Sequence, residues 1–272
     1  MNQELVVQQY EIDSLQARVD MALTRAGLSN GVIRWPELAP LDQFHIRGLA
    51  GSKELAEAVG FREGSEVLDV GCGLGGPARF LAATYGCRVT GIDLSPSFVD
   101  VATTLTDRCG LSEGVSFRCA DALSLPFEEA SFDDAWTQHV AMNIADRLTF
   151  YTEIRRVLKP DGRLAILDVV AGNGHPLHFP VPWANQPELS FLLTADSMRE
   201  VLRRAGFAEV SWDDKTEASL SWFGELQCRM RSSPPLSMAI IMGPRFREKV
   251  ENLGRNLQEG RIRLVQAVFR RA

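Results

Sequence analysis

Residues 67–82, VLDVGCGLGGPARFLA, hold the densest set of chemistry-bearing positions in this chain. In it Gly71, Gly73 and Gly76 satisfy the GxGxxG pattern, in which a strand ends, glycines make a tight turn and a helix begins, here around Pro77. Without Cβ atoms, such a loop can bring its backbone amides against a nucleotide-like ligand. The pattern predicts a nucleotide-binding loop, and by itself it fits a nicotinamide dinucleotide as well as S-adenosylmethionine.

Asp69 is the residue that separates these two cofactors. It lies two positions before Gly71, at the mouth of the expected loop. A carboxylate there repels a pyrophosphate, whereas it attracts the ammonium group of a methionyl moiety. The sequence therefore favours S-adenosylmethionine, and a nicotinamide-dependent oxidoreductase is the alternative enzyme class.

Two further aspartates close the next two expected strands. Asp93 can accept hydrogen bonds from both ribose hydroxyls, and we place Leu94 beside it in the cofactor site. The alternative role for Asp93 is the N-cap of the next helix, but Ser95 suits that position better. We expect Asp121 to accept from the adenine amino group while the Ala122 N–H meets a ring nitrogen. The alternative interpretation of Asp121 is an ordinary turn aspartate.

His139 is the candidate for proton transfer. Methyl transfer from a sulfonium is an in-line displacement, so the protein mainly orients the acceptor and, where needed, removes its proton. His139 follows the fourth strand, and histidine titrates near neutral pH, which suits a general base. A hydrogen-bonded histidine that only shapes the pocket is an equally good interpretation. We also place Asn143 in the wall of the acceptor pocket.

The histidines of GNGHPLHFP raise the question of a metal site. His175 and His178 lie three positions apart, but prolines break any helix there and no third ligand follows in a recognised pattern. We therefore expect no metal, and we assign His178 to the wall of the acceptor pocket.

Several aromatic side chains are further candidates for that pocket. Phe179, Trp183 and Phe191 can line an apolar pocket or cradle a cationic amine by cation–π attraction, and buried packing is the alternative. Tyr10, on an amphipathic N-terminal helix, can close over the site as a lid residue or simply pack that helix down.

Short apolar strands alternate with helices from residue 66 onward. The expected strands are 66–70, 88–92, 115–119, 133–136, 164–169, 209–212 and 261–268, and the expected helices include 2–27, 50–59 and 195–205, the last with Thr194 as its N-cap. This alternation is typical of a doubly wound, mostly parallel α/β sheet. We expect residues 1–60 to form an N-terminal helical cap or lid and residues 61–272 the cofactor-binding domain, with pocket-building insertions near 170–192 and 213–260.

Composition narrows the setting. The 272 residues are 45% hydrophobic and 24% charged, which fits one large α/β domain with a modest cap. A net charge of −6 provides no basic field for nucleic acid or for a membrane surface, and no apolar stretch approaches the roughly 20 residues that span a bilayer. No secretory signal is visible at the start, and the five cysteines form an odd set without a CxxC pair. We therefore expect a cytoplasmic protein.

Taken in order, the motifs LDVGCGLGG, GIDLS, CADALSLPF, SFDDAWTQHVAMNI and RVLKPDGRLAI resemble those of the class I S-adenosylmethionine-dependent methyltransferases over roughly residues 50–272. The resemblance implies a seven-stranded Rossmann-like sheet whose last strand is antiparallel and lies beside strand 164–169. It also implies that the cofactor is lined by Gly71, Gly73, Asp93 and Asp121.

Within that class, LDQFHIRGLAGSKELA, TQHVAMNIAD and HFPVPWA are similar to the sarcosine and dimethylglycine methyltransferase group and its sterol, tocopherol and natural-product relatives. The similarity implies that His45, Arg47 and Gly48 approach the methionine end of the cofactor. It further implies that Gln138 and His139 lie where the methyl group is transferred.

The sequence thus predicts transfer of a methyl group from S-adenosylmethionine to nitrogen or oxygen of a small-molecule metabolite. The alternatives are the oxidoreductase and a non-catalytic cofactor-binding protein on the same fold. Monomer and homodimer are both open.

Overall fold

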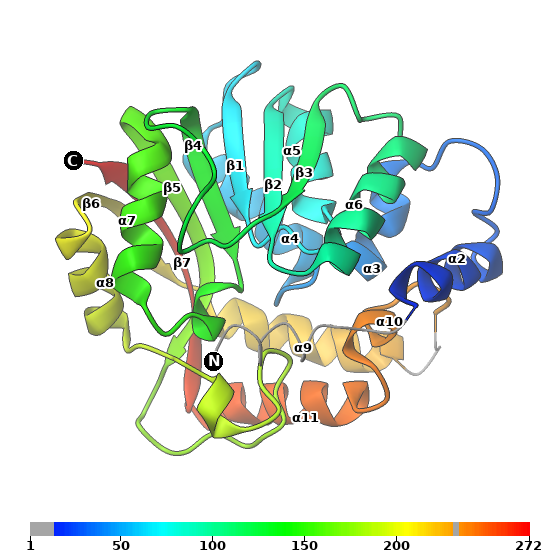
Figure 1. The fold of residues 1–272 in the computed structure, drawn as a ribbon. Coiled ribbons are helices and arrows are strands. Elements are labelled where there is room, and N and C mark those ends of the chain that lie inside the picture. Colours follow the sequence, from blue (N-terminus) through cyan, green and yellow to red (C-terminus); the bar gives the residue numbers. More distant parts are fainter. Residues whose placement is uncertain (1–13, 231–233) are drawn as a thin grey trace.

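Seven strands form one sheet through the molecule (Figure 1). The computed structural model describes residues 14–230 and 234–272. The strands are β1 Glu66–Val70, β2 Arg88–Asp93, β3 Val115–Cys119, β4 Phe132–Gln138, β5 Leu158–Ala171, β6 Phe207–Asp214 and β7 Ile262–Arg271. Their order is β3-β2-β1-β4-β5-β7-β6, with β7 antiparallel to β5 and β6 and the other neighbouring pairs parallel. The expected doubly wound α/β sheet and its antiparallel last strand are confirmed.

The central strands are apolar on both faces because helices cover the sheet on both sides. In β1, Val67 belongs to one hydrophobic cluster, while Leu68 and Val70 belong to another on the opposite face. Helices α4 Gly48–Val59 and α5 Gly76–Tyr85 contribute to the first cluster, and α7 Arg147–Val157 and α8 Ala195–Arg204 to the second. Figure 1 shows α7 and α8 together at one side of the sheet.

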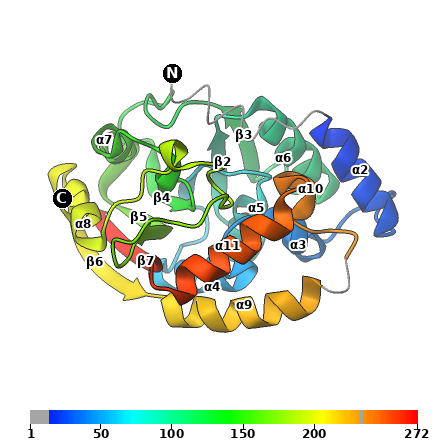
Figure 2. The same cartoon turned by 90° about the horizontal axis from the view of Figure 1, so that it is seen from below.

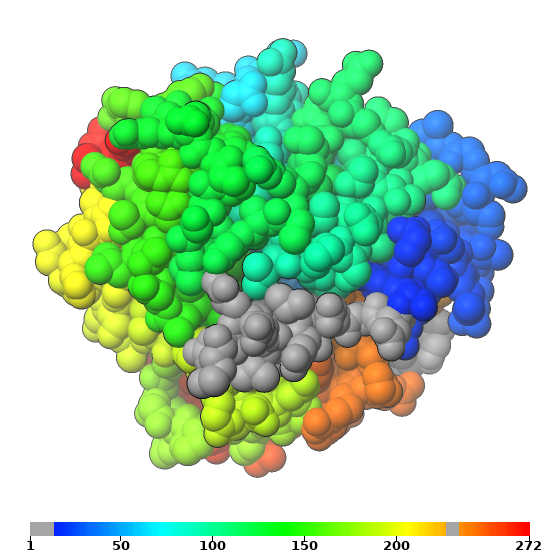
Figure 3. Space-filling model, in the orientation of Figure 1, coloured from blue at the N-terminus to red at the C-terminus, as the bar shows by residue number. Residues whose placement is uncertain are grey.

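The N-terminal segment divides between two parts of the molecule. Helix α4 shares a core with the sheet through Leu55, Ala56 and Val59, so the boundary expected at residue 60 falls inside this packing. Helix α2 Leu15–Arg25 is the described part of the helix expected from residue 2. It packs instead against α6 Pro96–Arg108 in a separate cluster. In the space-filling view α2, in blue, lies at the side of the molecule opposite β7, in red (Figure 3).

Two long segments interrupt the alternation of strands and helices. The segment between β5 and α8 holds a short 3-10 helix, η3 Pro187–Leu189. Between β6 and β7 the chain forms α9 Thr216–Met230, α10 Ala239–Met242 and α11 Phe246–Gln258. Seen from below, these three helices lie across one edge of the sheet (Figure 2). The remaining elements are η1 Trp35–Leu38, α3 Ala39–Asp42 and η2 Ala141–Asn143.

The helix caps show where local sequence rules succeed and fail. Thr194 caps α8 as expected, because its hydroxyl accepts a hydrogen bond from the Ser197 N–H. Ser95 occupies the N-cap position of α6, but it makes no capping bond through its side chain, and its hydroxyl pairs with Ser97. The Ser95 N–H donates instead to Asp93 Oδ1 at 3.0 Å. Ser95 therefore holds the N-cap position as expected, but without a capping bond from its side chain.

Candidate active site

Two adjoining cavities lie at the carboxyl ends of the central strands. The larger, of about 350 Å³, is reached by the ends of β1, β2 and β4, as expected for a ligand site at the switch point of a doubly wound sheet. The smaller, of about 40 Å³, lies under α9, α10 and α11. The cavities share Phe44, His45 and His139. We refer to them as the cofactor cavity and the apolar cavity.

The glycine loop forms one wall of the cofactor cavity. Gly71 has a φ of 75°, and a Cβ there would lie 2.3 Å from Val140 Cγ2. The clash with Val140 would by itself exclude any residue other than glycine. A Cβ on Gly76 would lie 2.5 Å from the Asp42 carbonyl oxygen. The Gly73 N–H donates to Asp93 Oδ2 at 3.0 Å, which ties the loop to the end of β2. The loop is therefore held in one shape by its own contacts.

A buried ion pair supports the loop from below. Arg79 donates to Asp42 Oδ2 at 2.7 Å and to the Leu74 carbonyl at 2.7 Å, and both ionic side chains are buried. Arg79 Nη1 also donates to Thr106 Oγ1 at 2.9 Å. This pair was not predictable from the sequence, because an arginine inside a helix gives no local sign that it is buried.

Asp69 is the most unusual polar group of the cofactor cavity. Its Oδ1 accepts from Trp136 Nε1 at 3.0 Å, and its Oδ2 has no hydrogen-bond partner among the described residues. Burial, with a further contribution from the negative charge of Asp93, raises the pKa of Asp69 to about 7. A buried carboxylate in this state gains from a cation supplied by a ligand. The residue therefore fits the ammonium group of S-adenosylmethionine.

The other predicted cofactor residues fall into two groups. Gly71, Gly73, Asp93, Leu94, Asp121, Ala122 and Gln138 all line the cofactor cavity together with Asp69. Burial raises the pKa of Asp93, and Asp121 Oδ1 accepts from the Leu123 N–H at 2.8 Å. Arg47 and Gly48 are absent from the described lining of both cavities, and the Arg47 guanidinium is paired with Glu54, to which its Nη1 donates at 2.7 Å.

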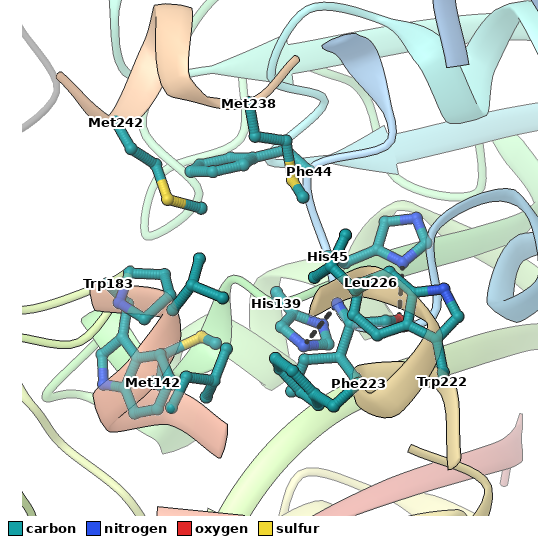
Figure 4. Close-up of a pocket in the computed structure, with 14 residues that line it drawn as sticks. Phe44, His45, His139, Met142, Trp183, Trp222, Phe223, Leu226, Met238 and Met242 are labelled. Atoms are coloured by element: carbon teal, nitrogen blue, oxygen red, sulfur yellow. Dashed lines mark hydrogen bonds between the residues drawn. The ribbon is translucent and has the colours of Figure 1, made fainter. Parts of the chain in front are cut away.

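Two histidines flank the backbone of Ile46 where the cavities meet (Figure 4). The Ile46 N–H donates to His139 Nε2 at 3.2 Å, and His139 Nδ1 lies 3.2 Å from the Leu167 carbonyl. Because a carbonyl can only accept, His139 carries its proton on Nδ1 and its Nε2 lone pair is already used. Burial, with the nearby His45, lowers the pKa of His139 to about 3. The geometry favours a neutral ring that forms part of the wall.

A polar cluster lies behind this wall. Burial lowers the pKa of His45 to about 4, and its Nδ1 lies 3.2 Å from the Ile46 carbonyl oxygen. Its Nε2 lies 3.1 Å from Ser52 Oγ, and Gln138 Nε2 donates to the same Oγ at 3.3 Å. Ser52 belongs to α4 and Gln138 ends β4, so the cluster joins a helix and a strand that flank the transfer point. The Gln138 amide is therefore held by α4.

The expected acceptor-pocket residues are only partly brought together. Trp183 lines the apolar cavity and donates from Nε1 to Ser190 Oγ at 2.9 Å, while Asn143 lines the cofactor cavity. His178 is bonded to Glu259 at 2.8 Å, and Phe179 and Phe191 are not part of the described cavity lining. Tyr10 lies outside the described residues. Within those residues no cluster of three or more His, Cys, Asp or Glu side chains could hold a metal.

Most of the apolar cavity wall was missed as individual residues, although the sequence analysis expected the 213–260 insertion to build a pocket. Besides the three shared residues, the wall consists of Ile46, Met142, Pro182, Trp183, Trp222, Phe223, Leu226, Met238, Met242, Val250 and Leu253. The helical spacing of Trp222, Phe223 and Leu226 marks an apolar face of α9, but spacing alone does not tell whether such a face packs in a core or lines a cavity.

Comparison with known proteins agrees with this geometry. A family model described as a methyltransferase domain matches residues 68–166. An O-methyltransferase of Aspergillus nomiae is 32% identical over 188 residues, which cover 68% of this chain and 83% of that protein. A methyltransferase of Streptomyces halstedii is 39% identical over 136 residues, so the chain spans about half (49%) of its length.

Solved structures show the same fold. A protein of Galdieria sulphuraria described as a putative sarcosine dimethylglycine methyltransferase matches with a TM-score of 0.69 at 22% identity over 82% of this chain and 85% of that one. The 4+2 cyclase SpnF matches with a TM-score of 0.70 at 25% identity over 100% of this chain and 97% of that one. The chain belongs to the class I S-adenosylmethionine-dependent methyltransferases.

Proposed function

We propose that this protein transfers a methyl group from S-adenosylmethionine to an oxygen or nitrogen of a small-molecule acceptor. One observation carries the proposal: the buried Asp69 carboxylate, with one oxygen unpartnered among the described residues, lies beside the glycine loop and Asp93. The O-methyltransferase relative and the wider family support the reaction class.

When bound, S-adenosylmethionine supplies the electrophilic methyl group on a sulfonium. Asp69 accepts from the ammonium group, and Asp93 accepts from the ribose hydroxyls in addition to the Gly73 and Ser95 amides that it already holds. Asp121 and Ala122 meet the adenine edge. These assignments follow from the shared lining of the cofactor cavity.

Gln138 and His139 are proposed to lie at the point of transfer, where the two cavities meet. His139 acts there as a fixed wall that keeps Ile46 against the end of β4, because both of its ring nitrogens are engaged. Catalysis then consists chiefly of holding the acceptor in line with the methyl group. Asn143 and Trp183 complete the surrounding wall.

The oxidoreductase alternative conflicts with the same carboxylate. A dinucleotide would bring its pyrophosphate to the glycine loop, beside the buried Asp69 and the partly buried Asp93, whose pKa values desolvation raises. The negative charges of the pyrophosphate would be repelled by these two carboxylates, and the low local dielectric would strengthen that repulsion.

The second candidate function is one in which a protein of this fold binds the cofactor but transfers no methyl group. The full-length likeness to SpnF favours it, because that relative is a cyclase. Labelled cofactor separates the two. Incubation with methyl-labelled S-adenosylmethionine and a panel of phenols, amines and sterols is expected to label one acceptor and to release S-adenosylhomocysteine. Tight binding of the cofactor with no methyl transfer to any compound of the panel would support the second candidate instead.

Two further features concern the setting of the protein. No described helix is long and apolar enough to cross a membrane. We propose a reducing, cytoplasmic location, supported by the free thiols of Cys72, Cys87, Cys109 and Cys119, and no nucleic-acid partner, supported by the net charge of −6.

A further inference from the structure

The apolar cavity has a distinct chemistry from the cofactor cavity beside it. Its wall brings together aromatic rings, thioethers and branched aliphatic chains, and none of its described lining residues carries an acidic or basic side chain other than the two histidines. Figure 4 shows Phe44 and Met238 at one side, Trp183 and Met142 at another, and Phe223 and Trp222 beside His139. A charged group placed against this wall would lose its hydration without gaining a partner.

The two histidines do not change this conclusion. His139 carries its proton on Nδ1 and donates it to the Leu167 carbonyl. Both ring nitrogens of His45 face protein oxygens, Nδ1 the Ile46 carbonyl and Nε2 Gln43 Oε1, each at 3.2 Å. The Nε2 atom of His139 accepts from the Ile46 N–H, and that of His45 faces Ser52 Oγ. Neither ring has a free lone pair for an acceptor proton. The carboxyl groups nearby lie in the lining of the cofactor cavity: Asp42, Asp69, Asp93, Asp121 and Asp146.

We propose that the acceptor is an uncharged, apolar molecule whose nucleophile is an acidic hydroxyl, a phenol or an enol, that gives up its proton without help from a protein base. This inference rests on the proposed methyl-transfer function and names its substrate class. The apolar wall binds the carbon skeleton, and the hydroxyl points toward His139 and Gln138, where the cavities meet.

The transfer step balances without a further reactant. The hydroxyl proton leaves to solvent, and a lone pair of the resulting oxyanion attacks the methyl carbon to form the O–CH₃ bond. The bond from that carbon to sulfur breaks, and its electron pair stays on sulfur, which becomes a neutral thioether. The negative acceptor and the positive sulfonium both become neutral, so an apolar, weakly solvating site favours the step.

Binding is tested with the whole protein saturated with S-adenosylhomocysteine, by calorimetric titration of 2-naphthol and, separately, of dimethylglycine. We expect 2-naphthol to bind and dimethylglycine not to. Leu226→Asn places an amide in the apolar wall and should weaken 2-naphthol at least tenfold while S-adenosylhomocysteine binds within twofold of wild type. Ser221→Asn, on the exposed face of the same helix, is the matched control and should change neither affinity.

The first titration keeps the two proposals apart. Failure of S-adenosylhomocysteine to bind contradicts the proposed function before any acceptor is added. If it binds but dimethylglycine binds in preference to 2-naphthol, or Leu226→Asn leaves the 2-naphthol affinity unchanged, the acceptor proposal is wrong and the proposed function stands.

Turnover gives an independent test. At saturating cofactor, kcat/KM for the acceptor is measured against pH with two phenols of different acidity, 2-naphthol and 4-nitrophenol. The inflection should move with the phenol, because the acceptor's own ionisation controls the rate. One inflection common to both phenols would show that a protein group removes the proton and would overturn the proposal.

Discussion

Cofactor affinity should depend on pH through Asp69, and this is the sharpest consequence of the site. Burial raises the pKa of this carboxyl from 3.8 to about 7 in the unliganded protein. The ammonium of the cofactor favours the ionised form, so binding at pH 6 should release a proton. Asp69→Asn keeps an oxygen for Trp136 Nε1 but cannot ionise, and its cofactor affinity should not follow this pH dependence.

The magnitude follows from linkage. Because the pKa of Asp69 is higher in the folded protein than in the unfolded chain, its protonation stabilises the fold. This stabilisation is fully present below pH 3.8 and is lost as the pH rises through about 7. The difference of about three pKa units is worth about 4 kcal/mol in the unliganded protein, as an upper bound. If only the ionised form binds, affinity should increase roughly 15-fold between pH 5.5 and pH 7 and then level off.

Calorimetry of S-adenosylhomocysteine in buffers of different ionisation enthalpy measures both the affinity and the proton release. His45 and His139, with pKa values of about 4 and about 3, do not titrate in this window. A wild-type affinity that is flat between pH 5.5 and pH 7 would contradict the assigned role of Asp69. So would the same slope in Asp69→Asn, because another group would then be responsible.

The remaining predictions concern single contacts. Asp93→Ala should weaken S-adenosylhomocysteine at least tenfold by calorimetry with an unchanged circular dichroism spectrum; unchanged affinity would remove Asp93 from the site. Arg79→Leu leaves Asp42 buried and unpaired and should lower the free energy of unfolding in urea by about 3–5 kcal/mol. The double variant Arg79→Leu with Asp42→Leu should lose less stability than Arg79→Leu alone. Thr194→Ala should cost about 1 kcal/mol in the same assay, since it removes a helix cap. His139→Gln should lower kcat without moving the pH profile; a profile that moves would restore the general-base interpretation.

The sheet was predictable because its signals are local. The parallel strands end at the same edge of the sheet, so Asp69 near the end of β1, Asp93 at the end of β2 and Asp121 just after β3 line one cavity. The limits of the long strand β5 were not predictable from local signals. Its start at Leu158 depends on pairing with Phe132 of β4 across an irregular register, and its end at Ala171 on pairing with β7, about a hundred residues further along the chain.

Contacts between distant segments account for the rest. The Ile46 N–H, which donates to Nε2 of His139, lies 93 positions away in the chain. The sequence around His139 therefore suggested a general base, and gave no sign of the contact that makes the ring part of the cavity wall. The apolar cavity is likewise built from segments far apart, among them Phe44, Met142 and Leu253. For His178 the pocket role stays a prediction: its ring is bonded to Glu259, and it is not part of the described cavity lining.

The central claim is that the cofactor cavity is built for S-adenosylmethionine, and competitive calorimetry tests it most directly. S-adenosylhomocysteine and NADH are titrated in turn into the same purified protein at pH 7.5. The structure predicts saturable binding of S-adenosylhomocysteine that is lost or strongly weakened in Asp93→Ala, and no heat of binding from NADH. Binding of NADH with no response to S-adenosylhomocysteine would contradict the account.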